Sequence, residues 1–217
     1  MLITVAAWLV SGALAIWLWL AFLRGGFWRA DQRLSGGLQD PARWPDITAV
    51  IPARDEVETI AAAVRSLAKQ DYAANVTIIV VDDGSTDGTS DAARSVFAQG
   101  VTIHVIEGKP LPEGWTGKMW AVAQGVARAE QVAPDGAFLL LTDADIAHGP
   151  DSLRRLVAKA EQDNLDLVSL MVRLRCKSGW EKLLIPAFIY FFQKLFPFPW
   201  VNNPKRPEAA AAGVDRS

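Results

Sequence analysis

Residues 47–175 show two alternating patterns of apolar and polar positions. Short, nearly unbroken apolar runs that end in polar clusters predict buried strands at 47–53, 76–83, 101–108, 137–145 and 165–175. Between these runs, apolar residues at helical spacing and helix-start signals predict helices at 56–70, 117–130 and 150–163 and within 85–99. Strands that are apolar on both faces are typical of a sheet that helices cover on both sides. The predicted fold is therefore α/β, a Rossmann-like, mostly parallel sheet.

The N-terminus carries a different pattern, because Leu2 to Leu23 are uncharged throughout. As a helix this run would be about 33 Å long, which is enough to cross a bilayer core. We expect a transmembrane helix at 1–23; the alternative is a cleaved signal peptide, which would need a positive start and a shorter apolar core. Arginines at 24, 29 and 33 follow the run, so residues after 24 are expected in the cytoplasm. Residues 24–46 are predicted to form a juxtamembrane linker.

Residues 176–217 are predicted to form a separate region beyond an α/β domain at 47–175. Within this region, residues 180–200 are apolar but contain three prolines and four charged or amide side chains, so a second span is not expected. Two interpretations remain open. One is an interfacial helix that lies in the headgroup plane, and the other is a helix that covers the core or meets further sequence.

Composition narrows the possible functions. The chain has 217 residues, half of them hydrophobic, and a net charge of −2. A chain with this charge and without a basic stripe is not expected to bind nucleic acid. A single cysteine and two histidines cannot form an internal disulfide or an ordinary zinc site.

Three of the predicted strands end in acidic or polar motifs, which parallel topology would bring to one edge of the sheet. The fourth strand ends in Asp143-Ala144-Asp145. Side chains two residues apart on an extended chain point the same way, so both carboxylates can face one point. Paired carboxylates suit Mg²⁺ or Mn²⁺, either of which would also bind phosphate oxygens. The alternative is that Asp145 caps a turn and Asp143 is simply solvated.

The other two motifs and a lysine belong to the same predicted edge. The segment "DDGSTDGT" at 82–89 could accept hydrogen bonds from a nucleobase and a ribose, or could simply form a turn. The segment "PARDE" at 52–56 could line the pocket with its backbone and acids, while its acids also suit a helix start. Lys118 lies near a predicted helix start, where it could bind a diphosphate or remain exposed.

Together, "VIPARDE", "VVDDGSTDGT", "GK…A…G" and "DAD" resemble the nucleotide-sugar half of a family 2 inverting glycosyltransferase of the GT-A fold. The resemblance covers roughly residues 47–175. The N-terminal run, "GWTGKMWA" and "VNNPKRPEAAAAG" further resemble the hopene-associated branch of that family, whose members occur in bacteria that make hopanoids. One departure is Gln124, where many relatives have Asn.

The resemblance implies a metal-dependent transferase in the bacterial inner membrane, with one N-terminal span and a cytoplasmic catalytic domain. A UDP-type sugar donor is favoured, with a polyisoprenoid or hopanoid-type lipid as the acceptor. Asp143 would approach the ribose and the metal, and Asp145 would bind the metal. The remaining donor-binding residues would be Pro52, Ala53, Arg54, Glu56, Asp82 or Asp83, and Lys118.

The resemblance also implies a catalytic-base Asp well downstream of the "DAD" motif. After Arg175 the only acids are Glu181, Glu208 and Asp215, and none of them lies in such a motif. We therefore expect a truncated form that binds the donor but lacks the catalytic base; the alternative is a natural short form completed by another chain. Two other classes stay open, a nucleotidyltransferase and a non-catalytic nucleotide-binding membrane protein. The acidic, glycine-free "PARDEVE" argues against the first of these.

Overall fold

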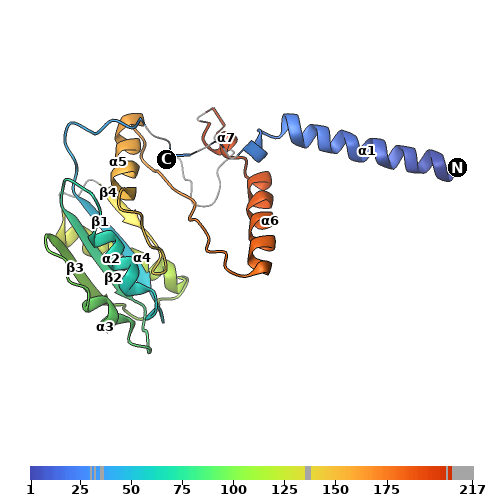
Figure 1. Ribbon diagram of the computed structural model, residues 1–217. Helices are drawn as coiled ribbons and strands as arrows, with labels where there is room; N and C mark the ends of the chain where they lie inside the picture. Colours follow the sequence, from blue (N-terminus) through green and yellow to red (C-terminus); the bar gives the residue numbers. More distant parts are fainter. Residues whose placement is uncertain (30, 32, 35–36, 135–137, 204, 207–217) are drawn as a thin grey trace. The chain divides into compact units, whose positions relative to one another are not determined.

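The computed structural model describes residues 1–29, 31, 33–34, 37–134, 138–203 and 205–206 (Figure 1). The chain divides into two compact units. Residues 38–162 form one of them, which we call the α/β unit. Residues 1–37 and 163–217 form the other, which we call the helical unit.

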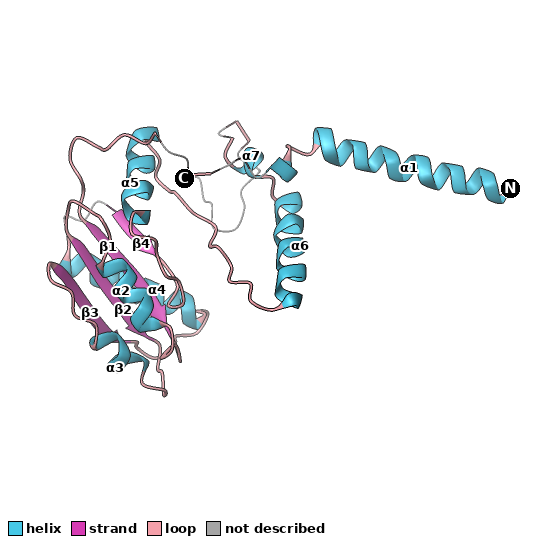
Figure 2. Cartoon of the chain, in the orientation of Figure 1, coloured by secondary structure: helices cyan, strands magenta, loops and turns pink. Residues whose placement is uncertain are grey.

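The α/β unit is built on a four-stranded, wholly parallel sheet (Figure 2). Its strands are β1 (Ile47–Ala53), β2 (Val76–Asp82), β3 (Val101–Glu107) and β4 (Phe138–Leu141), in the order β3-β2-β1-β4. In this register Ala53 lies beside Asp82, and Asp82 lies beside Glu107. The carboxyl ends of β1, β2 and β3 are therefore level, which brings the segments that follow them together.

Helices cover both faces of the sheet, as the apolar strands predict. One core cluster joins alternate residues of β1 and β2 to α2 (Ile60–Ala68), α3 (Thr89–Arg94) and α5 (Ser152–Asp163). A second cluster joins Ile79 and Val81 of β2 to α4 (Gly117–Val132). The predicted α/β fold with its parallel sheet is thus confirmed. The site is positioned where β1, β2 and β4 lead into loops and helices.

The helical unit contains α1 (Leu2–Leu23), a short 3₁₀ turn η1 (Phe27–Arg29), α6 (Gly179–Leu195) and α7 (Phe198–Val201). α6 begins with a capping box, in which Ser178 and Glu181 each bond the other's backbone N–H. Within the described residues, two helical stretches, Leu2–Leu23 and Gly179–Val201, are long and apolar enough to cross a membrane. Length and composition alone are weak support for a span, because buried core helices and signal sequences share them.

The predicted strand at 165–175 is wrong. These residues are described, and none of them is in a strand or helix, so the sheet has four strands and not five. Their apolar pattern is compatible with a strand, but a strand exists only when a neighbour satisfies its backbone hydrogen bonds. Among the described residues, the edge strand β4 pairs with β1 and with no other strand.

Several predicted boundaries also shift, and two of the shifts affect the site. Helix α2 begins at Ile60 instead of residue 56, because Asp55 has a left-handed backbone (φ 52°) and residues 57–59 form a turn. Strand β4 ends at Leu141, so the "DAD" motif lies in a loop and turn beyond the strand. Strand β1 matches its predicted range of 47–53, and helix α1 matches the uncharged run at 2–23.

Candidate functional site

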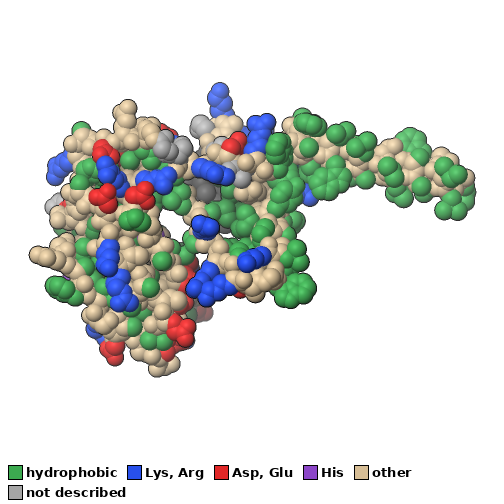
Figure 3. Space-filling view, viewed as in Figure 1, with side chains coloured by type: hydrophobic (Ala, Val, Ile, Leu, Met, Phe, Trp, Pro, Cys, Tyr) green, Lys and Arg blue, Asp and Glu red, His purple; other side chains and the backbone are tan. Residues whose placement is uncertain are grey.

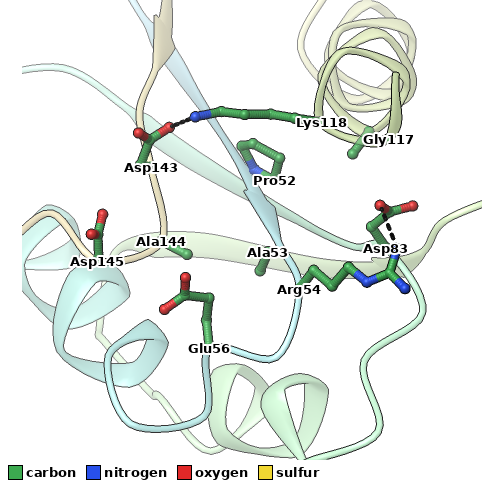
Figure 4. Close-up of a pocket in the computed structure, with 11 residues that line it drawn as sticks. Pro52, Ala53, Arg54, Glu56, Asp83, Gly117, Lys118, Asp143, Ala144 and Asp145 are labelled. Atoms are coloured by element: carbon green, nitrogen blue, oxygen red, sulfur yellow. Dashed lines mark ion pairs between the residues drawn. The ribbon is translucent and has the colours of Figure 1, made fainter. Parts of the chain in front are cut away.

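A pocket of about 380 Å³ lies at the carboxyl ends of β1 and β2, beside the start of α4 and the loop after β4 (Figure 4). Its position agrees with the rule that ligands of open α/β sheets bind beyond the strand ends. The residues that line it are Pro52, Ala53, Arg54, Glu56, Asp83, Gly117, Lys118, Ala121, Asp143, Ala144 and Asp145.

The loops after β1 and β2 are held together by hydrogen bonds. The Glu56 backbone N–H donates to Thr89 Oγ1 at 2.8 Å, and the Val57 N–H donates to Asp87 Oδ2 at 3.0 Å. In return, the Thr86 N–H donates to Asp55 Oδ1 at 2.9 Å. Asp55, Asp87 and Thr89 therefore support the two loops internally. A turn was one of the two interpretations that the sequence left open for "DDGSTDGT", and Asp, Ser and Thr are typical of such turns. The hydrogen bonds that join this turn to the loop after β1 were not predicted.

Asp82 and Asp83 lie in different environments, although the sequence alone allowed either of them to bind the nucleobase. Asp82 is buried; its carboxylate accepts from the Ser85 N–H at 2.8 Å and from the Ser90 hydroxyl. Burial acts to raise the pKa of Asp82, but the hydrogen bonds from Ser85 and Ser90 outweigh it and hold the pKa below its ordinary value. Asp82 is not among the residues that line the pocket, whereas Asp83 is.

Asp83 faces the pocket between Arg54 and the first turn of α4. Its Oδ2 lies 3.7 Å from Arg54 Nη1. A side chain at Gly117 would place its Cβ 2.8 Å from the same oxygen, so the Asp83 carboxylate would have to shift to make room for it. Sequence reasoning did not assign Gly117 a function, and its contact with Asp83 is visible only in the structure.

Lys118 reaches across the pocket from α4 to the loop after β4. Its Nζ lies 2.6 Å from Asp143 Oδ1 (Figure 4). Both side chains are more than half exposed, so we assign the pair little energy of its own. The contact matters because it brings a cation and a carboxylate together in the pocket.

The "DAD" loop keeps the alternation that its sequence predicts, although it is not part of the strand. Ala144 is buried, while Asp143 and Asp145 are exposed and line the pocket (Figure 4). Two supports that sequence reasoning missed hold this loop. His148 Nε2 lies 3.0 Å from Thr142 Oγ1, and the His148 backbone N–H donates to Ser66 Oγ at 2.9 Å.

The pocket residues fit a divalent cation that is shared with a ligand. Within the described residues, no group of three or more His, Cys, Asp or Glu side chains is placed to hold a metal. The protein would thus offer the carboxylates of Asp143 and Asp145, and further oxygens would come from phosphate and water. Mg²⁺ and similar hard cations are commonly held in this way, by one or two carboxylates and substrate phosphates.

Comparison with known proteins gives a consistent match. The family model described as "Glycosyl transferase family 2" matches residues 48–209. The chain is 32% identical over 158 residues to the succinoglycan biosynthesis protein ExoO of Rhizobium meliloti, covering 67% of the chain and 42% of that protein. It is 27% identical over 149 residues to the dodecaprenyl-phosphate galacturonate synthase of Rhizobium johnstonii, covering 67% of the chain and 39% of that protein.

Among solved structures, the fold is similar to a mannosyltransferase from Pyrobaculum calidifontis determined in complex with GDP-Man and Mn²⁺. The TM-score is 0.51 at 26% identity, covering 73% of the chain and 47% of that structure. The chain thus spans about two fifths of the length of the curated relatives it matches, and about half of this structure.

Proposed function

The chain belongs to glycosyl transferase family 2, and we propose that it forms the donor-binding part of a membrane-anchored transferase that moves a sugar from a nucleotide sugar to a lipid. The pocket carries this proposal. It collects four residues of "PARDE" (all but Asp55), the second aspartate of "DDGSTDGT", Lys118 and the "DAD" carboxylates around a single space at the sheet edge. Family membership favours glycosyl transfer over the nucleotidyltransferase and the non-catalytic binding protein.

We propose that Asp83 receives the nucleobase, with Arg54 beside it and Pro52, Ala53 and Glu56 forming the adjoining wall. Asp82 then acts indirectly, because its buried carboxylate fixes the turn that carries Asp83. A donor of the UDP type is favoured. The GDP-Man complex of the similar mannosyltransferase makes GDP the necessary comparison.

Asp143 and Asp145 are proposed to hold Mg²⁺ or Mn²⁺ with the donor diphosphate. When bound there, the cation would supply Lewis-acid stabilisation of the leaving diphosphate. Lys118 Nζ lies 2.6 Å from Asp143 Oδ1. We propose that this ammonium group binds the same diphosphate as a point charge. Transfer with inversion requires a base on the acceptor side, and we assign no residue of this chain to that role.

A lipid acceptor and an inner-membrane location form the second part of the proposal. One relative is named for dodecaprenyl phosphate, and α1 is long and apolar enough to anchor the protein. With α1 as a single span, the arginines after it would place the α/β unit in the cytoplasm. Placement in the hopene-associated branch rests on "GWTGKMWA" and "VNNPKRPEAAAAG"; most of the second motif lies outside the described residues.

Calorimetric titration of UDP, GDP and UDP-sugars into the detergent-solubilised chain, with Mn²⁺ or with EDTA, tests the proposal. We expect nucleotide binding that requires the metal and that Asp145→Asn abolishes. Lys118→Met should weaken binding about tenfold, the equivalent of one charge-assisted hydrogen bond. Asp91→Asn is the matched control, because Asp91 lies on α3 with its side chain 89% exposed and away from the pocket.

Metal-independent binding that survives Asp145→Asn would refute the proposed metal site. A folded sample that binds none of these nucleotides would refute the proposed donor site itself.

A further inference from the structure

We propose that α6 lies within the cytoplasmic leaflet of the membrane, held there by Arg24 at the end of α1. The first observation is the surface of α6. Every residue of this helix is described, and none has a buried side chain. Its exposed apolar residues include Trp180, Leu183, Leu184, Phe188, Phe191 and Leu195. A helix that is apolar on nearly every side is typical of an apolar environment and not of water.

The second observation is the junction between α6 and the end of α1. Arg24, the first residue after α1, donates from Nε to the Lys194 carbonyl at 3.2 Å and from Nη2 to the Leu195 carbonyl at 3.3 Å. These carbonyls belong to the last turn of α6, where helix geometry leaves acceptors unpaired and favours a cation. The C-terminal end of α6 is therefore fixed to the point where α1 ends.

Aromatic contacts strengthen the same junction. The Arg24 guanidinium lies 5.0 Å from the centre of the Trp200 ring, and the Arg206 guanidinium lies 4.5 Å from the same ring centre. Gly25 has a left-handed backbone (φ 64°), and a Cβ there would lie 2.6 Å from Trp200 Nε1. Phe27 meets Tyr190 of α6 edge to face at 5.2 Å. The junction thus combines tryptophan, tyrosine and arginine, which are the side chains that membrane surfaces favour.

The third observation is length. Between Lys182 and Gln193, α6 has ten uncharged residues, Leu183 to Phe192. They span about 15 Å, which is half of a hydrocarbon core of about 30 Å. Polar side chains at both ends of this stretch therefore disfavour a crossing, and a position within one leaflet satisfies both the apolar centre and the polar ends.

Charge identifies the surface as lipid rather than a second copy of the chain. The helical unit contains eleven Lys and Arg against six Asp and Glu, a formal charge of +5. Two such units would repel each other, whereas anionic headgroups would attract each of them. In Figure 3, apolar side chains cover α1, and Lys and Arg side chains gather over the rest of this unit. This inference rests on the proposed membrane span of α1 and not on the proposed donor site.

Spin labels on single cysteines in the 217-residue chain test the inference. Cys176, the only cysteine, would be changed to Ser; labels would be placed at Leu184→Cys, Phe188→Cys and Phe191→Cys. The matched control is Phe97→Cys, which lies in the α/β unit and is 91% exposed. The protein would be reconstituted in phosphatidylcholine vesicles with and without phosphatidylglycerol. Accessibility to oxygen and to a water-soluble nickel chelate would then be measured.

We expect the three α6 labels to favour oxygen over the nickel chelate, with a positive depth parameter, and the control to show the opposite. Labels on α6 that reach the nickel chelate as freely as the control would overturn the inference. Labels shielded from both reagents would also overturn it, since they would indicate cover by protein.

Arg24→Ala tests the junction separately. We expect the label at Phe188→Cys to become more mobile and shallower in this variant. Arg29→Ala is the control, because it removes an equal charge from a guanidinium that lies over Trp28 and not at the end of α6. Unchanged depth and mobility in Arg24→Ala would refute the role of Arg24.

Discussion

The two units of this chain place apolar side chains in opposite ways. In the α/β unit, β1, β2 and α2 bury all of their Val, Leu and Ile side chains. In the helical unit, α1 and α6 expose theirs, and the buried apolar residues among those described are Leu20, Phe27, Pro197 and Val201. The formal charges also differ, −7 for residues 38–162 and +5 for the remainder.

This difference indicates that the two units are adapted to different surroundings. Burial of apolar side chains stabilises the α/β unit in water. The helical unit, in contrast, leaves its apolar side chains exposed, which is typical of a surface that binds a partner or a membrane. Its positive charge suits an anionic surface. The acidic pocket and the basic junction are thus separate features of separate units.

Truncation of an apolar side chain should produce the largest contrast. Leu67→Ala removes a side chain of α2 that is 1% exposed, and we expect it to destabilise the α/β unit by about 2–5 kcal/mol. Phe188→Ala on α6, where the side chain is 60% exposed, should leave that stability unchanged in detergent. Hydrogen exchange of the β1 and β2 amides measures both effects. Equal effects of the two substitutions would contradict the separation of the units.

Addition of a methyl group should show the same contrast on a smaller scale. A Cβ at Gly125 of α4 would lie 2.2 Å from Val50 Cγ1 and 3.1 Å from Val81 Cγ2, whereas nothing lies within 4 Å of one at Gly12 of α1. We expect Gly125→Ala to cost about 1–3 kcal/mol by overpacking and Gly12→Ala to cost nothing measurable in the same exchange experiment. A neutral Gly125→Ala would show that α4 can move away from the sheet.

Asp82 should give the smallest effect, and one that depends on pH. Its folded pKa is lowered, so its stabilisation is complete above the unfolded value of about 3.9 and is lost as the pH falls through the folded value. Asp82→Asn should therefore reduce stability by about 1–2 kcal/mol at pH 7, and by progressively less below about pH 4.

Chemical denaturation of both proteins across this pH range measures the difference. Asp91→Asn, at an exposed carboxylate, should show no such dependence. A difference between Asp82→Asn and the native protein that is independent of pH would show that the Asp82 charge contributes nothing.

Periodicity and motif order were sufficient for the main features of the α/β unit. Continuous apolar runs identified β1 to β4. Burial on both faces explains this signal for β1 and β2. β3 is mostly half-buried, and Leu139 and Leu141 of β4 are exposed. The rule that parallel strands present their carboxyl ends to one edge placed Pro52, Lys118, Asp143 and Asp145 together, and they do line one pocket. Their roles toward metal and donor stay predictions.

Only the tertiary structure distinguishes two adjacent aspartates and shows which groups each segment contacts. Asp82 and Asp83 are indistinguishable in sequence, yet Ser85 and Ser90 take one carboxylate and the pocket takes the other. Residues 165–175 have a strand-like pattern without a strand, because lateral hydrogen bonds depend on a neighbour that no local pattern specifies. The link from Arg24 to Lys194 and Leu195 joins residues 170 and 171 positions apart. Local pattern determines which segments are apolar, and long-range packing decides which groups they meet.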